Sequence, residues 1–528
     1  MDMPVTFSRP ERISTLFSFR TFQVMLLALC GCAVVLSCVQ VVHFLPVTSE
    51  NIYPESSGVL SALRWFQGLP LYQDFRQPPY LTTPFPPIWY ALTAQVAKLG
   101  ATDLDSLTRF GRLLALACLV GIAGLAYLWN RRLGFSRLLS ALAPAFFLSV
   151  PILVPWAVSA RPDLLALLLS FLAVYVAATE GGLASFGAAS ILASLAFLSR
   201  HNSVAAPVAI VLWLASRRRW RPAFLFCVIW AFIVGPVLIA FQISSGGFLF
   251  LNLSGGKFGQ LSLSYSRDVL ARLFEPQGHA FAIALFGFGV YGIFEALRRG
   301  DVRLRLLTLY AFVAFGLAVL SSAAAGSAPN HFLEAALAFA ALIPVGLVSL
   351  ELSWSNGAPS SVLAMVLVFV FLVPSLDVQR SNVVHNRADD LRPLIPLIMN
   401  RRVFTDIPYV AARATSPESL DLASLLNSER RGRGRGWSSA AVVRDLTEKR
   451  YPLVILSQPI EEAYLPAGLY PRYPRMDAAM QAAISENYSL CSRLANAYIY
   501  APLSSERSSP ICPLRTEETR RVVVRLAP

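Results

Sequence analysis

Long apolar runs constrain this chain more than any other feature of its sequence. Runs of roughly 16 to 25 mostly apolar residues recur about ten times between residues 21 and 373. Each is close to the length that an α-helix needs to cross about 30 Å of hydrocarbon. Charged residues make up only 14% of the 528, against about 25% in a typical soluble protein. The mean hydropathy is +0.56. The sequence therefore predicts an all-α polytopic membrane bundle.

Basic residues lie mainly in short loops between the apolar runs. Examples are Arg131-Arg132, Arg217-Arg218-Arg219 and Arg298-Arg299. The net charge of +14 could indicate a nucleic-acid partner, but this placement is typical of loops retained in the cytoplasm. We therefore expect no nucleic-acid binding. Arg9, Arg12 and Arg20 precede the first run, which puts the N-terminus in the cytoplasm.

The alternation of these basic loops predicts about 11 transmembrane helices, with the C-terminus outside the cytoplasm. Residues 88–99 are apolar but short, and a crossing there would invert every later basic loop. We expect that segment to be an interfacial helix on the outer surface. The N-terminal run resembles a signal peptide but continues to residue 45, so we interpret it as an uncleaved anchor. The predicted spans are 21–45, 110–129, 138–156, 164–178, 186–198, 203–215, 223–243, 280–296, 306–324, 332–350 and 362–373.

The chain divides into two predicted domains. Residues 1–374 form the transmembrane domain, whose first outer loop spans 46–108, and residues 375–528 form a small extracytoplasmic α/β domain. The second domain is rich in charge. Of the seven cysteines, Cys491 and Cys512 lie in this domain and could form a disulfide outside the cytoplasm. Its strand-like runs are 453–456, 497–500 and 522–526.

Polar residues in the outer loops are the candidate functional residues, because ionisable groups beside a membrane bundle are costly unless they are paired or used. The first-loop carboxylates Glu55 and Asp74 are the candidate catalytic groups. No His, Cys and carboxylate cluster fixes a metal site, although outer acidic residues could hold Mg or Mn through oxygen ligands. The candidate substrate-binding residues are Arg161, Asp163, Arg200, His201, Lys257, Asn330 and His331.

Each candidate also has a purely structural interpretation. Glu55 follows Pro54 and suits the first turn of a helix; Asp74 could be an ordinary loop residue. Arg161-Pro162-Asp163 also fits a helix start, and Arg200-His201-Asn202 fits interfacial snorkelling. Lys257 follows two glycines, but the full phosphate-loop pattern is absent.

Several motifs together resemble those of C-type (GT-C) polytopic membrane glycosyltransferases. The resemblance is to the bacterial branch related to protein O-mannosyltransferases and lipid A aminoarabinose transferases. It covers residues 22–350 well and the remainder loosely. The motifs are Tyr53-Pro54-Glu55, Gly68-Leu69-Pro70-Leu71-Tyr72-Gln73-Asp74, Pro86-Pro87-Ile88-Trp89-Tyr90, Gly111-Arg112-Leu113-Leu114, Arg161-Pro162-Asp163, Asn330-His331-Phe332-Leu333-Glu334 and Val403-Phe404-Thr405-Asp406.

The resemblance implies transfer of a sugar, with inversion, from a polyprenyl-phosphate donor to an extracytoplasmic acceptor. It implies that Glu55 is the general base and that the first loop holds two helices lying along the membrane. Asp74 or Asp163 would orient the acceptor or hold a metal. Many relatives carry an Asp-Glu pair where this chain has Pro54-Glu55, so the acceptor, whether lipid, glycan or protein, stays open.

Two other functions fit a polytopic chain. One is a transporter or a flippase for lipid-linked sugars, although charges are scarce within the spans and no paired broken helices suggest inverted repeats. The other is a non-catalytic assembly protein. For all three we expect a multi-pass protein of the cell inner (plasma) membrane.

Overall fold

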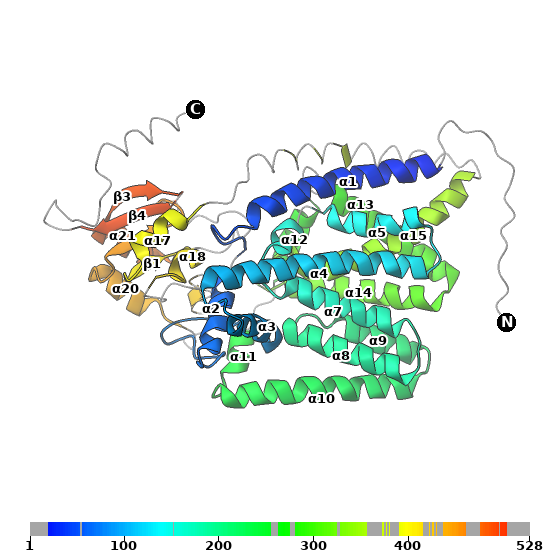
Figure 1. The fold of residues 1–528 in the computed structure, drawn as a ribbon, viewed down its shortest axis with the longest axis horizontal. Helices are drawn as coiled ribbons and strands as arrows, with labels where there is room; N and C mark the ends of the chain where they lie inside the picture. Colours follow the sequence, from blue (N-terminus) through cyan, green and yellow to red (C-terminus); the bar gives the residue numbers. More distant parts are fainter. Residues whose placement is uncertain are drawn as a thin grey trace.

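Figure 1 shows the fold of the chain in a computed structural model. A bundle of helices carries a small domain with a β-sheet at one end, beside the helices of the first loop. The residues that the structure describes are 19–52, 55–150, 153–254, 262–274, 280–324, 328–355, 390–414, 437–460, 476–495 and 497–503, with the single positions 372, 373, 376, 380, 422, 425, 426 and 429.

Six of the described helices are long and apolar enough to cross a membrane. Four shorter apolar helices pack among them: α5 (Arg137–Leu148), α7 (Asp163–Ala177), α8 (Leu183–Ser199) and α9 (Ala205–Ser216). The six are α1 (Phe19–Phe44), α4 (Leu104–Arg132), α10 (Trp220–Ser244), α13 (Ala280–Arg299), α14 (Val302–Ser322) and the stretch Pro329–Glu351, which joins the 3-10 helix η2 (Pro329–Phe332) to α15 (Leu333–Ser355).

These helices coincide with ten of the eleven predicted spans. The eleventh, 362–373, falls almost entirely outside the described residues, so the total number of spans stays a prediction. One predicted span is interrupted: α5 ends at Leu148, and a short helix, α6 (Val154–Ala157), follows. Pro155 lies in the first turn of α6, where proline is tolerated because the N–H groups of a first turn have no partner within the helix.

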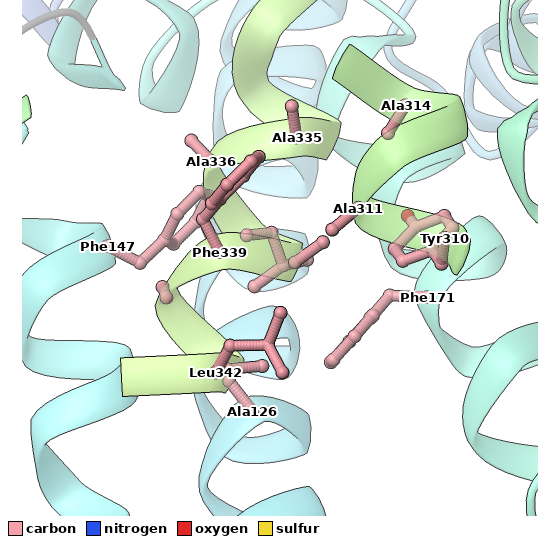
Figure 2. Packing of buried hydrophobic residues seen from close by; sticks show 14 of the residues in the cluster. Ala126, Phe147, Phe171, Tyr310, Ala311, Ala314, Ala335, Ala336, Phe339 and Leu342 are labelled. Atoms are coloured by element: carbon pink, nitrogen blue, oxygen red, sulfur yellow. The ribbon is translucent and has the colours of Figure 1, made fainter. Parts of the chain in front are cut away.

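Tight packing joins α13 to α15 in the bundle core. A Cβ atom added to Gly292 would lie 2.2 Å from the carbonyl oxygen of Leu342, so glycine is what lets these backbones approach. Aromatic rings fill the space beside them, including Phe171 stacked on Tyr310 at 6.1 Å between ring centroids (Figure 2).

The first loop contains the two helices that the sequence predicts, α2 (Glu55–Phe66) and α3 (Pro87–Lys98). They pack against each other through a buried apolar cluster that includes Val59, Leu63 and Trp89. Figure 1 shows both at the end of the bundle nearest the β-sheet. Their orientation along a membrane surface stays a prediction.

The described residues beyond 390 form a small sheet with short helices, here called the C-terminal domain; that they make up a separate extracytoplasmic domain stays a prediction. Its four-stranded sheet has the order β1-β2-β4-β3, in which β1 and β2 are parallel and the other pairs are antiparallel. Cys491 in β3 is disulfide-bonded; its predicted partner, Cys512, and the expected strand 522–526 lie outside the described residues. The strands are β1 (Val403–Thr405), β2 (Leu453–Leu456), β3 (Tyr488–Leu494) and β4 (Ala497–Pro502).

Short helices complete both domains. In the C-terminal domain α20 and α21 pack together, and in the bundle α11 packs on α10. The remaining elements are α11 (Phe248–Leu253), α12 (Leu263–Leu273), η3 (Arg392–Leu394), α17 (Ile395–Ile398), α18 (Pro408–Ala411), α20 (Ala440–Thr447) and α21 (Ala478–Asn487).

The basic loops gather at the end of the bundle opposite the first loop. Helix α4 starts beside α2 and α3 and ends at Arg132, whose carbonyl oxygen accepts a hydrogen bond from Arg303 at 3.3 Å. Arg217 pairs with Glu180 at 2.8 Å in a neighbouring loop. This common end agrees with the charge pattern from which the topology was predicted.

The contact at Gly292 predicts a stability difference between two glycines of α13. Gly292→Ala should lower the unfolding temperature, because the new methyl group collides with the α15 backbone. Gly287→Ala should leave it unchanged or raise it, since no atom lies within 4 Å of that added Cβ and alanine favours helix by about 1 kcal/mol. Thermal unfolding in detergent tests this; equal unfolding temperatures for the two variants would contradict it.

Candidate active site

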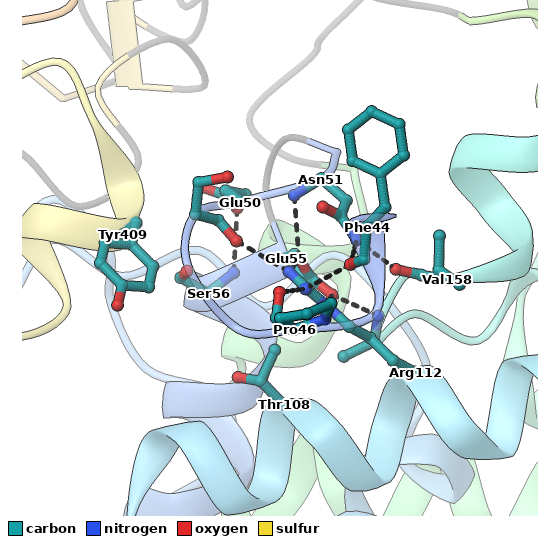
Figure 3. A network of polar contacts seen from close by, with 12 residues as sticks. Phe44, Pro46, Glu50, Asn51, Glu55, Ser56, Thr108, Arg112, Val158 and Tyr409 are labelled. Carbon is teal, nitrogen blue, oxygen red and sulfur yellow. Dashed lines mark hydrogen bonds and ion pairs between the residues drawn. The ribbon is translucent and has the colours of Figure 1, made fainter. Parts of the chain in front are cut away.

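Glu55, the first residue of α2, lies in a fully buried polar network (Figure 3). Only 1% of it is exposed. One carboxylate oxygen, Oε1, accepts hydrogen bonds from Nε of Arg112 at 2.9 Å and from the backbone N–H of Ala160 at 2.6 Å. The other, Oε2, accepts from Nη2 of Arg112 at 2.7 Å and from the N–H of Asn51 at 3.1 Å. These four hydrogen bonds fill the acceptor capacity of a carboxylate.

Arg112 lies in α4 and is also fully buried. Two of its five N–H groups bind Glu55 in the bidentate arrangement that is strong between guanidinium and carboxylate. The others donate to the carbonyl oxygens of Phe44 at 2.8 Å, Pro46 at 2.7 Å and Ser49 at 2.8 Å. Because every donor is satisfied, Arg112 joins α4, the end of α1 and the start of the first loop.

Residues 158–162, between α6 and α7, connect this network to a second one at the start of α7. The carbonyl oxygen of Val158 accepts a hydrogen bond from Asn51 at 2.6 Å, and Ala160 donates to Glu55. Ala160 packs directly on Gly111: a Cβ added there would lie 2.8 Å from the Ala160 Cα. Glycine beside Arg112 therefore allows the close approach that brings the Ala160 N–H to the carboxylate.

The second network surrounds Asp163, the first residue of α7, which is 2% exposed. Its Oδ2 accepts from Nε of Arg161 at 3.0 Å, and its Oδ1 accepts from Nδ2 of Asn330 at 2.7 Å and lies 3.3 Å from Nε of Arg200. Ala160 and Asp163 are three residues apart, so their Cα atoms are separated by at most about 11 Å. One short segment therefore joins the Glu55 network to the Asp163 network.

Aromatic rings hold Arg161 in this second network. Its guanidinium lies 5.1 Å from the ring centre of Phe85, in the first loop, and 5.0 Å from that of Trp156, in α6. Both distances are within the range of cation–π attraction. Arg161 therefore links the first loop to the Asp163 network.

A third carboxylate, Glu334, lies one helical turn beyond Asn330. Its Oε1 accepts hydrogen bonds from the hydroxyl of Tyr310 at 2.9 Å and from the hydroxyl of Ser170. Asn330, one turn before Glu334, donates to Asp163 and so connects this part of the chain to the second network. The site is therefore continuous from the first loop to the start of α15.

Asp74 does not share these contacts. Its carboxylate makes a bidentate pair with Arg76, at 2.7 and 2.8 Å, on a partly exposed turn. The hydrogen bonds from the Arg76 side chain lower the pKa of Asp74. A carboxylate with a lowered pKa is a weaker proton acceptor, so the structure gives Asp74 less support as a base than its place in the first loop suggested.

The structure brings together four of the predicted substrate-binding residues, Arg161, Asp163, Arg200 and Asn330. His201 and His331 are half-buried and follow Arg200 and Asn330 in the chain, whereas Lys257 lies outside the described residues. Within the described part of the chain, no three His, Cys, Asp or Glu side chains are grouped as metal ligands. The oxygens of Glu55 and Asp163 bind cationic or amide donors instead, so these residues do not fit a metal site.

Sequence reasoning did not select Arg112 or Glu334 as site residues. Both stand in motifs that support the family resemblance, and both lie inside long apolar runs. An ionisable residue in an apolar run is itself a functional signal. Weighing the charges within the runs as heavily as those in the outer loops would have identified both.

Comparison with known proteins supports the fold. No family model matches the chain, and no curated protein matches it in sequence. The crystal structure of apo ArnT from Cupriavidus metallidurans superimposes with a TM-score of 0.53 at 12% identity, covering 90% of this chain and 99% of ArnT. ArnT bound to undecaprenyl phosphate gives a TM-score of 0.50 at 12% identity, covering 90% and 98%.

A further match is the archaeal oligosaccharyltransferase AglB from Archaeoglobus fulgidus, solved with an inhibitory peptide and a dolichol-phosphate. Its TM-score is 0.47 at 13% identity, covering 93% of this chain and 75% of AglB. The chain therefore shares the fold of ArnT, with nearly complete coverage of both chains. The resemblance predicted from the sequence is confirmed at the level of the fold.

The Glu55–Arg112 pair predicts a strong coupling in stability. Glu55→Gln and Arg112→Gln should each lower the free energy of unfolding by about 3–5 kcal/mol, because each leaves a buried partner unpaired. The double variant should be less destabilised than the sum of the two by about 1–3 kcal/mol. Unfolding of the purified variants in detergent measures the cycle.

The pair of Asp74 and Arg76, on a partly exposed turn of the first loop, is the matched control. Asp74→Asn and Arg76→Gln should change stability by less than about 1 kcal/mol, since solvent screens an exposed ion pair. If the Glu55 and Arg112 effects were equally small and additive, the buried pair would not hold the loop.

Proposed function

We propose that this chain is a membrane glycosyltransferase that moves a sugar from a polyprenyl-phosphate donor to an acceptor outside the cytoplasm. The fold it shares with ArnT supports this proposal, since one of the matching ArnT structures contains undecaprenyl phosphate. The observation that carries it is the network of Asp163, Arg161 and Arg200 at the first-loop end of the bundle.

The charges of this network favour an anionic ligand. Two guanidinium groups share one carboxylate, so the three side chains have a net charge of +1 in nearly dry surroundings. The arginine side chains are 11% and 12% exposed, whereas Asp163 is 2% exposed. Arginine binds phosphate oxygens in a bidentate geometry. A lipid phosphate that reaches the two arginines would balance the remaining charge, and Asp163 would orient them.

In the proposed reaction, Glu55 takes the proton of the acceptor hydroxyl as its oxygen attacks the anomeric carbon of the sugar. The bond between that carbon and the phosphate oxygen breaks, and the lipid phosphate leaves with the bonding electrons. Arg161 and Arg200 stabilise the charge that develops on it. A single displacement of this kind inverts the anomeric centre.

This role for Glu55 requires that at least one of its four hydrogen bonds break before it accepts a proton. The bond from the N–H of Asn51, at 3.1 Å, is the longest. Donor or acceptor binding next to residues 158–163 would supply the change. Asp74 remains a candidate for orienting the acceptor from the rim of the loop. The proposal involves no step through a metal ion.

We propose that the protein lies in the inner membrane with its first loop and C-terminal domain outside the cytoplasm. The basic end of the bundle would then face the cytoplasm. The disulfide at Cys491 supports this orientation, because disulfides persist in oxidising compartments. A flippase for lipid-linked sugars is the second candidate, since the arginine pair would serve phosphate binding equally well.

The phosphate role predicts a loss of lipid affinity in two variants. Arg161→Gln and Arg200→Gln should each raise the Kd for undecaprenyl phosphate about 10-fold or more, the value of one charge-assisted contact. Arg219→Gln should leave it unchanged, because Arg219 pairs with Glu180 at the opposite end of the bundle. Binding to protein in nanodiscs measures this; equal effects at all three positions would contradict the assignment.

The transfer reaction itself is tested by comparing a deletion strain with strains that carry the wild-type gene or Glu55→Gln. Mass analysis of envelope lipids and glycans should reveal a sugar that is lost on deletion, restored by the wild type and still absent with Glu55→Gln. Turnover is normalised to folded protein because the variant also loses the Arg112 pair. Near-normal turnover would remove Glu55 as base, and movement of lipid-linked sugar in vesicles without an acceptor would favour the flippase.

A further inference from the structure

The side chain of Phe75, in the first loop, lies in the core of the C-terminal domain. Phe75 has no exposed surface and belongs to a buried cluster with Phe404 of β1, Trp437 and Tyr451. The loop thus contributes a core residue to a domain that begins about 300 residues later in the chain. Burial of this side chain stabilises the first loop and the C-terminal domain only while the two are in contact.

A second aromatic residue of the loop strengthens this contact. The ring of Tyr80 meets the ring of Trp437 edge to face, with centroids 6.2 Å apart. Leu251 of α11 also packs against the cluster. The C-terminal domain therefore packs against both the first loop and helix α11 of the bundle.

Polar contacts hold the same loop at its two ends. The N–H of Leu391 donates to the carbonyl oxygen of Thr48 at 2.8 Å, before Glu55. Arg413 forms an ion pair with Asp105, in the first turn of α4. Between them, α18 packs against α2, and Figure 3 shows Tyr409 of α18 beside the Glu55 network. The C-terminal domain contacts the loop on both sides of Glu55.

The bundle holds the opposite side of the segment that carries Phe75. Asn252 of α11 is fully buried, and its amide donates to the carbonyl oxygen of Gln73 at 2.7 Å and accepts from the N–H of Thr83 at 2.9 Å. Residues 73–83 are therefore fixed between α11 and the C-terminal domain. Two partners on opposite sides determine the position of this segment.

We propose that Phe75 is a positioning residue that makes the C-terminal domain and the first loop one cooperative unit. Release of Phe75 frees residues 73–83 and loosens the loop that carries Glu55. The C-terminal domain thereby positions the loop that carries Glu55, the proposed base for the acceptor hydroxyl. This consequence rests on the proposed transferase function. The cooperativity itself does not depend on that function.

The test is hydrogen exchange of the full-length protein carrying Phe75→Ala. Amides of residues 46–108 and of β2, β4 and α21 should all exchange at least about ten-fold faster. Amides of the bundle helices α13 and α15 should keep their protection, which separates loss of positioning from global destabilisation. Leu69→Ala is the matched control, because Leu69 lies in the same loop but is 39% exposed; it should leave the C-terminal amides unchanged.

Two further variants keep the test decisive if Phe75→Ala does not fold. Phe75→Leu retains an apolar side chain and should give a smaller increase in the same segments. Arg413→Gln removes a separate contact and should also accelerate exchange on both sides. Faster exchange confined to the loop, with the C-terminal domain unaffected, would overturn the proposal.

A functional readout distinguishes this proposal from the proposed reaction. Phe75→Ala should lower the rate of sugar transfer while leaving the Kd for undecaprenyl phosphate within about two-fold, because Phe75 packs in the cluster with Phe404 and Trp437, whereas Arg161 and Arg200 are held by Asp163 of α7. If no sugar transfer is found for the wild type, the proposed reaction fails, and the exchange result still decides the coupling. If Phe75→Ala leaves the transfer rate unchanged despite faster exchange, the positioning role is wrong.

Discussion

The buried pair of Glu55 and Arg112 is the interaction on which the first-loop end of this protein depends. Two unit charges without exposed surface are stable only if their hydrogen-bonding groups are satisfied, and here every one is. Satisfying them requires carbonyl oxygens from the end of α1, N–H groups from Asn51 and Ala160, and a helix that presents Arg112. Three separate parts of the chain are therefore fixed by one desolvated ion pair.

This arrangement places a limit on the chemistry at Glu55. A carboxylate with four hydrogen bonds is well positioned but occupied, so any role as a base is coupled to movement of its neighbours. Ala160 binds Glu55 and immediately precedes Arg161, which we propose binds the donor phosphate. Occupancy of the phosphate site and the availability of the base can therefore depend on the same short segment.

The fold was largely predictable from sequence because long apolar runs and the placement of arginines are global constraints. The helix at residues 88–99 was predicted from the charge pattern, and strands β2 and β4 were predicted from local strand-like runs. The sequence predicts that four site residues lie in loops at the same face of the membrane: Arg161, Asp163, Arg200 and Asn330. It does not predict which of their side chains pair, because the periodicity of apolar residues carries no information about such contacts. The pairing of Glu55 with Arg112 and the burial of Phe75 in a remote domain could not be predicted, because both join segments far apart in the chain.

The burial of Phe75 also has a consequence for biosynthesis. The ribosome completes the first loop long before it synthesises the residues that surround Phe75, since Phe404, Trp437 and Tyr451 lie beyond residue 400. During that interval an aromatic side chain of the loop stays without its final partners while the bundle inserts. The loop reaches its mature structure only when the residues around Phe75 have been synthesised and folded, so a product truncated before residue 400 would be left with an immature first loop.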